Sequence, residues 1–75
     1  MTADEPALQL DYLGLQCPEP IVRLSRRMGE VEPGQLIEVF ADDPAAGPDL
    51  AAWCRMLGHE LVAAEPPRFL VRRLR

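Results

Sequence analysis

Residues 13–24 read LGLQCPEPIVRL, and here the pattern of the sequence changes from that of a strand to that of a helix. The preceding ALQLDYL (7–13) alternates apolar and polar residues, which predicts a half-buried strand that Gly14 ends. The following PEPIVRLSRRMG (18–29) predicts a helix with one apolar stripe. That stripe consists of Ile21, Leu24 and Met28. The quoted stretch is therefore a loop from a strand end into a helix N-terminus.

A second strand and a second helix follow. The Pro-Gly turn EPGQ leads into LIEVFA (36–41), whose nearly continuous apolar character predicts a central strand. After a polar loop, a second helix is expected to begin at Pro48 or Asp49 and to end at Leu57, with Gly58 as its cap. Its expected apolar face comprises Leu50, Trp53, Cys54 and Leu57.

Two further strands, HELVAAE (59–65) and RFLVRRL (68–74), are joined by the tight turn EPPR, which predicts an antiparallel hairpin. Two helices at this spacing can cover one face of a four-stranded sheet, and right-handed crossovers make the first two strands parallel if they are neighbours. We expect an α+β fold in the order β-α-β-α-β-β, a two-layer sandwich with two helices packed on one face of a four-stranded mixed sheet. It forms a single domain (7–75) after a short flexible N-terminal tail (1–6).

The composition limits the classes of function. The chain has 75 residues and a formal net charge of −4, which argues against nonspecific binding of nucleic acid. No apolar run is long enough to span a membrane, and the N-terminus lacks the pattern of a secretory signal. We therefore expect a cytoplasmic protein that binds neither nucleic acid directly nor a membrane.

The cysteines, Cys17 and Cys54, differ in setting. With a single histidine, His59, they are too few for a structural zinc site, so no metal is expected. Cys54 lies on the apolar face of the second helix, which favours core packing. His59 is expected at the surface or as a local hydrogen-bond partner. With no base paired to Cys17, a hydrolase of the Cys/His type is poorly supported.

The chemistry of Cys17 depends on opposing charges. The partial positive charge of a helix N-terminus favours the thiolate, and the two prolines that follow the cysteine, Pro18 and Pro20, stiffen the backbone. Glu19 opposes this effect, and so do Asp42 and Asp43 if the parallel topology brings their loop to the same sheet edge, because nearby carboxylates raise a thiol pKa. The sequence predicts a Cys17 sulfur that points toward solvent, and it leaves the thiolate fraction open.

All eight basic residues are arginines, and they cluster. Arg23, Arg26 and Arg27 face outward on the first predicted helix. A second group follows near the C-terminus: Arg68, Arg72, Arg73 and Arg75. Each group is either a solvated face or a docking patch for a partner protein.

From Leu10 to Arg73 the sequence resembles the TusA (SirA-like) family of sulfur carrier proteins. The stretches that carry the resemblance are LGLQCPEP, PGQLIEVFADDP, WCRMLGHELV and FLVRR. The family signature is a Cys-Pro-x-Pro element directly after a glycine-containing loop. In this sequence the signature comprises Gly14, Cys17, Pro18, Glu19 and Pro20.

The resemblance implies that Cys17 accepts sulfane sulfur as a persulfide, from a cysteine desulfurase or a rhodanese, and passes it to a downstream sulfur-relay protein. The protein would then be a monomeric carrier component rather than a stand-alone enzyme. It would need no cofactor, since the sulfur is cargo. Family members serve tRNA 2-thiouridine synthesis or dissimilatory sulfur metabolism, with links to molybdenum cofactor synthesis. The alternative is a regulatory or interaction module with Cys17 as a redox-sensing cysteine.

Overall fold

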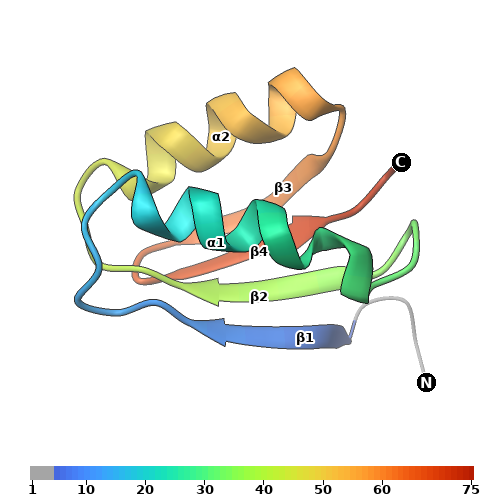
Figure 1. The fold of residues 1–75 in the computed structure, drawn as a ribbon, viewed down its shortest axis with the longest axis horizontal. Helices are drawn as coiled ribbons and strands as arrows, with labels where there is room; N and C mark the ends of the chain where they lie inside the picture. Colours follow the sequence, from blue (N-terminus) through green and yellow to red (C-terminus); the bar gives the residue numbers. More distant parts are fainter. Residues whose placement is uncertain (1–4) are drawn as a thin grey trace.

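The four strands form one mixed sheet in the order β1-β2-β4-β3, and two helices cover one of its faces (Figure 1). The structure, a computed structural model, describes residues 5–75. Its elements are β1 (Pro6–Asp11), α1 (Glu19–Arg27), the short 3-10 helix η1 (Met28–Glu30), β2 (Leu36–Phe40), α2 (Ala46–Leu57), β3 (Glu60–Glu65) and β4 (Arg68–Arg72). This arrangement confirms the predicted two-layer α+β fold. Of the predicted tail, residues 1–4 lie outside the described residues, and β1 already begins at Pro6.

The strand directions also agree with the sequence pattern. β1 pairs with β2 in parallel, whereas β4 is antiparallel to both β2 and β3. The apolar β2 lies inside the sheet, between β1 and β4, as its composition predicted. Because β1 and β2 are parallel neighbours, the loops that follow them emerge at the same edge of the sheet.

The second helix begins earlier than predicted, at Ala46 rather than at Pro48 or Asp49. The backbone N–H of Asp49 donates to the carbonyl oxygen of Ala45 at 3.0 Å and starts the helical ladder. Pro48 is tolerated as the third helical residue because the first N–H groups of a helix have no helical partner. Proline in a first turn therefore does not mark the first residue of this helix.

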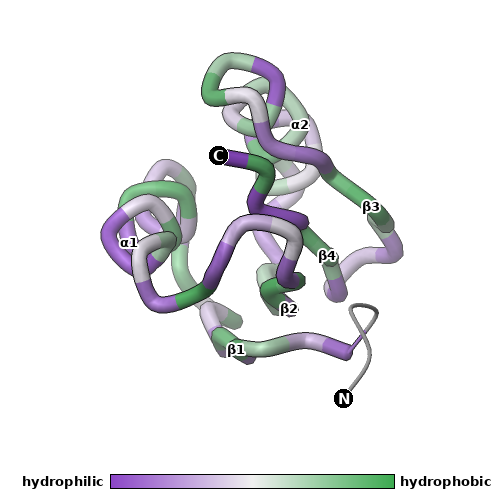
Figure 2. The backbone as a smooth tube through the Cα atoms, turned by 90° about the vertical axis from the view of Figure 1, so that its right-hand side faces the viewer, coloured by the Kyte–Doolittle hydropathy of each residue, from purple (hydrophilic) through white to green (hydrophobic). Residues whose placement is uncertain are grey.

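The core lies between the sheet and the helices. Its fully buried side chains include Leu24 of α1, Leu50 of α2, Val39 of β2 and Phe69 of β4. Figure 2 shows both helices on the same side of the sheet, with hydrophilic and hydrophobic residues alternating along α1. The chain thus buries one face of each helix against one face of the sheet.

Leu57 does not belong to this core, although the helical spacing predicted that it would. It is 45% exposed, whereas Cys54 is only 2% exposed. The C-terminal end of α2 lies at the edge of the molecule, where the chain turns into β3 (Figure 1). Trp53 is half-buried, and its ring packs against His59 with the centroids 5.5 Å apart. The spacing predicted the face of α2 correctly, but not how far along the helix that face is covered.

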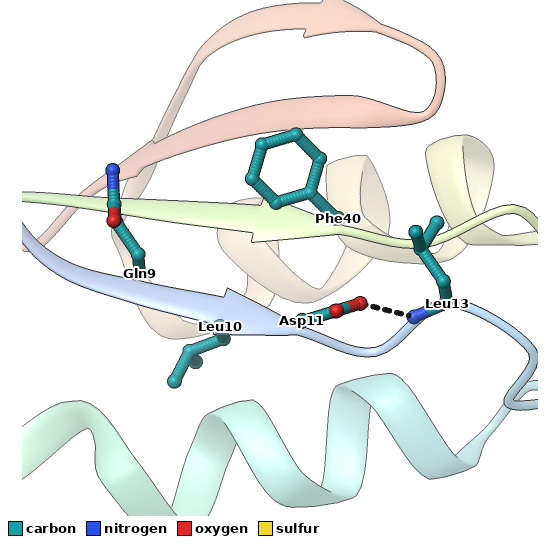
Figure 3. A pocket seen from close by; sticks show the side chains of 5 residues that line it. All are labelled: Gln9, Leu10, Asp11, Leu13 and Phe40. Atoms are coloured by element: carbon teal, nitrogen blue, oxygen red, sulfur yellow. Dashed lines mark hydrogen bonds between the residues drawn. The ribbon is translucent and has the colours of Figure 1, made fainter.

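A polar network crosses the face of the sheet that points away from the helices. Glu38 of β2 is only 7% exposed, and Gln9 Nε2 of β1 donates to its Oε1 at 2.9 Å. Arg68 Nε of β4 donates to the other carboxylate oxygen at 2.5 Å. Figure 3 shows Gln9 on the side of β1 away from α1, toward which Leu10 points. Both oxygens of this buried carboxylate therefore have a partner, as a buried charge requires.

Two of the other C-terminal arginines also bind acceptors within the chain. Arg72 Nη1 donates to the carbonyl oxygen of Gly34 at 2.7 Å. Arg73 Nη1 donates to the carbonyl oxygen of Val31, which follows η1. These side chains connect the end of β4 to the turn before β2. The C-terminal group of arginines is therefore neither a purely solvated face nor a free docking patch.

The C-terminal residues pack against the end of α2. Gly58 adopts a left-handed conformation (φ +77°) and caps the helix, as predicted. The backbone N–H of Leu74 donates to His59 Nδ1 at 3.2 Å. Partial burial and the positive charges of Arg73 and Arg75 lower the pKa of His59. His59 is thus a local hydrogen-bond partner, one of the two roles that the sequence predicted. Among residues 5–75, neither helix is long and apolar enough to cross a bilayer.

We expect Gly58→Ala to destabilise the protein. A side chain at a positive φ costs about 1–2 kcal/mol, and a Cβ at this position would come within 2.7 Å of Arg75 Nε. Urea unfolding followed by circular dichroism measures the loss. Gly29→Ala is the matched control, since its Cβ would meet no atom within 4 Å. Equal stability of the two variants would contradict this explanation.

We also expect stability to fall as the pH is lowered from about 7.5 to about 5.5. The folded-state pKa of His59 lies below its ordinary value of 6.5, so the unfolded chain binds the proton more readily. The contribution of neutral His59 is complete above pH 6.5 and is lost as the pH falls through that value toward the folded-state pKa. Urea unfolding at each pH measures it. His59→Asn, which keeps an acceptor but does not titrate, should flatten this part of the profile, and an unchanged slope would argue against it.

Candidate functional site

Two loops form the candidate site, and the parallel pairing of β1 with β2 brings them together. One runs from Tyr12 to Pro18 and leads into α1, and the other runs from Ala41 to Ala45 and leads into α2. Both lie at the same end of the sheet (Figure 1). The expected juxtaposition of Cys17 with the loop that contains Asp42 and Asp43 is therefore present.

The first loop is held by side-chain carboxylates. Asp11 Oδ1 accepts the backbone N–H of Leu13 at 3.1 Å, as Figure 3 shows. Gly14 has φ +83°, a conformation that other residues rarely adopt, and its N–H donates to Asp42 Oδ1 at 3.0 Å. β1 ends at Asp11, before the stop predicted at Gly14, and Gly14 joins the two loops.

Asp43 makes the second connection between the loops. Its Oδ2 accepts the backbone N–H of Cys17 at 3.4 Å, and its Oδ1 accepts the N–H of Ala45 at 2.8 Å. The N–H of Glu19 donates to the carbonyl oxygen of Gln16 at 2.9 Å. The two amides next to the sulfur therefore donate elsewhere, and neither is available to stabilise a Cys17 thiolate.

Proline also shapes the start of α1. Pro18 precedes the helix and Glu19 is its first residue, so neither proline occupies the first helical position. The carbonyl oxygen of Pro18 accepts the N–H of Val22 at 2.9 Å, and Pro20 is buried. This geometry settles which residue begins the helix, a point that the sequence left open.

The Cys17 side chain is half-buried and packs against the core, rather than pointing freely into solvent as predicted. Burial, a hydrogen bond with the Asp49 side chain and the negative charges of Asp43 and Asp49 raise the pKa of Cys17 to about 11. The cysteine is therefore present as a thiol near neutral pH. The helix N-terminus would lower the pKa of Cys17, but burial and the two carboxylates raise it by more.

Asp49 is the residue of this site that the sequence analysis missed. It lies in the first turn of α2, where acidic residues are common because they interact favourably with the helix dipole. That location gave no reason to connect it with Cys17. Only the packing of α1 beside α2 brings the carboxylate to the sulfur.

The predicted docking arginines remain on the outer side of α1. Arg23 Nε lies 3.0 Å from Glu19 Oε2, and Arg27 Nε lies 2.7 Å from Glu30 Oε2. Arg26 is exposed and makes no ion pair within residues 5–75. Glu19 was expected to act against the Cys17 thiolate, but its carboxylate binds Arg23 instead, and it is not among the groups that raise the pKa of the thiol.

Surface hollows lie between and beside these elements. A groove of about 250 Å³ between the helices is lined by Pro18, Ile21, Asp49, Ala52, Trp53 and Met56, of which Pro18 follows Cys17 in the sequence. A second hollow, of about 330 Å³, lies between the Asp42–Asp43 loop and the turn at Pro66 and Pro67. The third, of about 450 Å³, lies along β1 and β2 and does not include Cys17 (Figure 3). Within residues 5–75, no group of three histidine, cysteine or acidic side chains could hold a metal ion.

Comparison with known proteins extends these observations. A family model described as "Sulfurtransferase TusA" matches residues 8–72. The match includes both loops of the candidate site, both helices and all of the four strands except the first two residues of β1.

We expect alkylation of Cys17 by iodoacetamide to accelerate about tenfold per pH unit and not to level off near pH 8.5, because only the thiolate reacts. Mass mapping of peptides should place the label on Cys17, since Cys54 is 2% exposed. The same protein in urea is the control, in which the profile should bend near pH 8.5, the value for an ordinary cysteine. A plateau at or below that pH in the folded protein would contradict the raised pKa.

Proposed function

This chain belongs to the TusA family of sulfurtransferases, and we propose that it carries sulfane sulfur as a persulfide on Cys17. The donor is a cysteine desulfurase or a rhodanese, and the acceptor is a downstream sulfur-relay protein. The end use is tRNA thiolation or dissimilatory sulfur metabolism in the cytoplasm, and the carrier acts as a monomer.

The observation that carries this proposal is the contrast between the two thiols. Cys17 is partly exposed on a loop fixed by Asp43, whereas Cys54 is buried in the core, and both are free. A second reachable thiol would attack a persulfide, release the sulfur as sulfide and leave a disulfide. Burial of Cys54 supports a carrier that keeps its cargo until an acceptor arrives.

The transfer step needs no external oxidant or reductant. The Cys17 thiol loses its proton, and its sulfur attacks the outer sulfur of the donor persulfide. A new S–S bond forms on Cys17, the S–S bond of the donor breaks, and the donor sulfur takes up a proton. The outer sulfur keeps its oxidation state throughout. Delivery repeats the same exchange with the acceptor thiol as the nucleophile.

The surface around Cys17 supports a protein partner rather than a small substrate. The groove between α1 and α2 reaches Pro18, directly after the cysteine, and its lining is mainly apolar. Arg23, Arg26 and Arg27 lie on the outer side of α1 and offer charged contacts. We assign these three arginines to partner docking, where the planar guanidinium can bind carboxylates in two-pronged fashion.

A redox-sensing role, the alternative from the sequence, has less support. Sensor cysteines are typically low-pKa thiols next to a resolving cysteine. Here burial and two carboxylates raise the pKa of Cys17, and Cys54 is buried in the core.

We expect incubation with a cysteine desulfurase and cysteine to add the mass of one sulfur atom to the protein, and a reductant to remove it. Cys17→Ser should fold, as judged by circular dichroism, and take up no sulfur above background. Cys54→Ser is the control and should load normally. Sulfur uptake by Cys17→Ser would refute the assignment. Absence of uptake by the unmodified protein, with oxidation of Cys17 by peroxide instead, would favour the redox-sensing role.

A further inference from the structure

The hollow between the Asp42–Asp43 loop and the turn from β3 to β4 joins parts of the chain that are far apart in the sequence. Its volume is about 330 Å³. The backbone N–H of Ala41 donates to the carbonyl oxygen of Pro67 at 2.9 Å and connects the loop to the turn. Phe69 of β4, which is 1% exposed, also lines the hollow. Hydrogen bonding and core packing therefore hold its walls in place.

The lining of this hollow offers apolar surface and hydrogen-bond acceptors. Four of the lining residues are prolines, which have no backbone N–H to donate: Pro44, Pro48, Pro66 and Pro67. The charged side chains in the lining are those of Asp42 and Asp43, which accept hydrogen bonds but do not donate them when ionised. A complementary ligand therefore has an apolar stem and ends in a group that donates hydrogen bonds.

The negative charge of the two carboxylates is not neutralised within residues 5–75. In that part of the chain, the hydrogen bonds to Asp42 and Asp43 come from backbone N–H groups, and neither aspartate forms an ion pair with an arginine. Arg68, which follows Pro67, binds Glu38 instead. The hollow is therefore complementary to a cation.

Resting on the proposed function, we propose that this hollow is a docking site for an arginine side chain of the protein that donates sulfur to Cys17. The aliphatic stem of the arginine packs against the prolines, and its guanidinium binds Asp42 and Asp43. Arginine fits better than lysine because its planar head is more weakly hydrated and holds five donors in a fixed fork. Arginine is also enriched at the centres of protein interfaces.

The same two aspartates connect the hollow to the loop that contains Cys17. Asp42 Oδ1 accepts the N–H of Gly14 at 3.0 Å, and Asp43 Oδ2 accepts the N–H of Cys17 at 3.4 Å. A donor protein anchored at these carboxylates is therefore held beside the loop that carries the sulfur. Together with the arginines assigned to docking on α1, the hollow gives the docking surface charges of both signs, which fix the orientation of a partner.

An NMR titration of the isotope-labelled protein with an acetylated peptide, Gly-Ser-Arg-Ser-Gly, tests the site. At millimolar peptide we expect saturable shifts of the amide signals of Ala41, Gly47 and Phe69, which line the hollow, and weaker binding as the salt concentration rises. The control peptide has citrulline in place of arginine, keeps the shape without the charge and should cause no saturable shift. Shifts that are absent, that are confined to another surface or that are equal for both peptides would overturn the proposal.

Two variants test the charge and the shape of the hollow separately. Asp42→Asn removes one charge but keeps an oxygen that can accept the backbone N–H bound there, and it should weaken binding of the arginine peptide about two- to fivefold. Gly47→Ala places a methyl group 3.6 Å from Phe69 Cε1, an ordinary contact, and should weaken binding because it fills part of the hollow.

Each variant has a matched control elsewhere in the chain. Glu32→Gln removes the same charge from the turn at the opposite end of β2, and Gly29→Ala adds a methyl group that meets no atom within 4 Å. Both should bind the arginine peptide as the unmodified protein does, and circular dichroism verifies the folding of all four variants. If Asp42→Asn and Gly47→Ala bind the peptide as tightly as their controls, the hollow is not the site.

A loading experiment tells the failure of this inference apart from that of the proposed function. The arginine peptide should slow the loading of Cys17 by a desulfurase or a rhodanese, and the citrulline peptide should not. If loading proceeds but the arginine peptide neither binds in the hollow nor slows it, the carrier role stands and the docking site does not. If the peptide binds in the hollow but neither donor loads Cys17, the carrier role is overturned, and the assignment of the arginine to a sulfur donor falls with it.

Discussion

Parallel pairing of β1 with β2 is the constraint on which the site depends. Parallel strands need a crossover, and α1 supplies it, so the loops that follow β1 and β2 emerge at the same sheet edge. Asp42 and Asp43 then bind the amides of Gly14 and Cys17 across the two loops. Without the pairing, the carboxylates and the cysteine would have no reason to meet.

At this edge of the sheet, the helix N-terminus favours a Cys17 thiolate, whereas the nearby carboxylates disfavour it. A helix N-terminus stabilises an anion through its free N–H groups and its dipole. Near Cys17 these groups are either absent, because of the prolines, or donate to Asp43 and Gln16. Burial and negative charge therefore determine the state of the thiol, and its pKa rises to about 11.

The arginines show how tertiary contacts separate residues that look alike in sequence. Arg68 binds the buried Glu38, and Arg73 binds a backbone carbonyl beside η1, so both belong to the framework. Arg23 and Arg27 pair with neighbours on the exposed side of α1, where such ion pairs contribute little to stability. The arginines of α1 thus stay on the exposed side of that helix, whereas Arg68 and Arg73 are engaged within the chain.

The sequence by itself determined the order of elements, the central place of β2 and the position of Cys17 before a helix, because hydrophobic period and proline or glycine punctuation are local properties. The first residue of α2 and the exposure of Leu57 escaped it, since both depend on how the helix packs against the rest of the chain. Nor did the sequence indicate that Asp49 acts on Cys17, because acidic residues are common in the first turn of any helix. Only the packing of α1 against α2 brought that carboxylate near enough to raise the pKa of Cys17, because charge acts through distance in space rather than through separation along the chain.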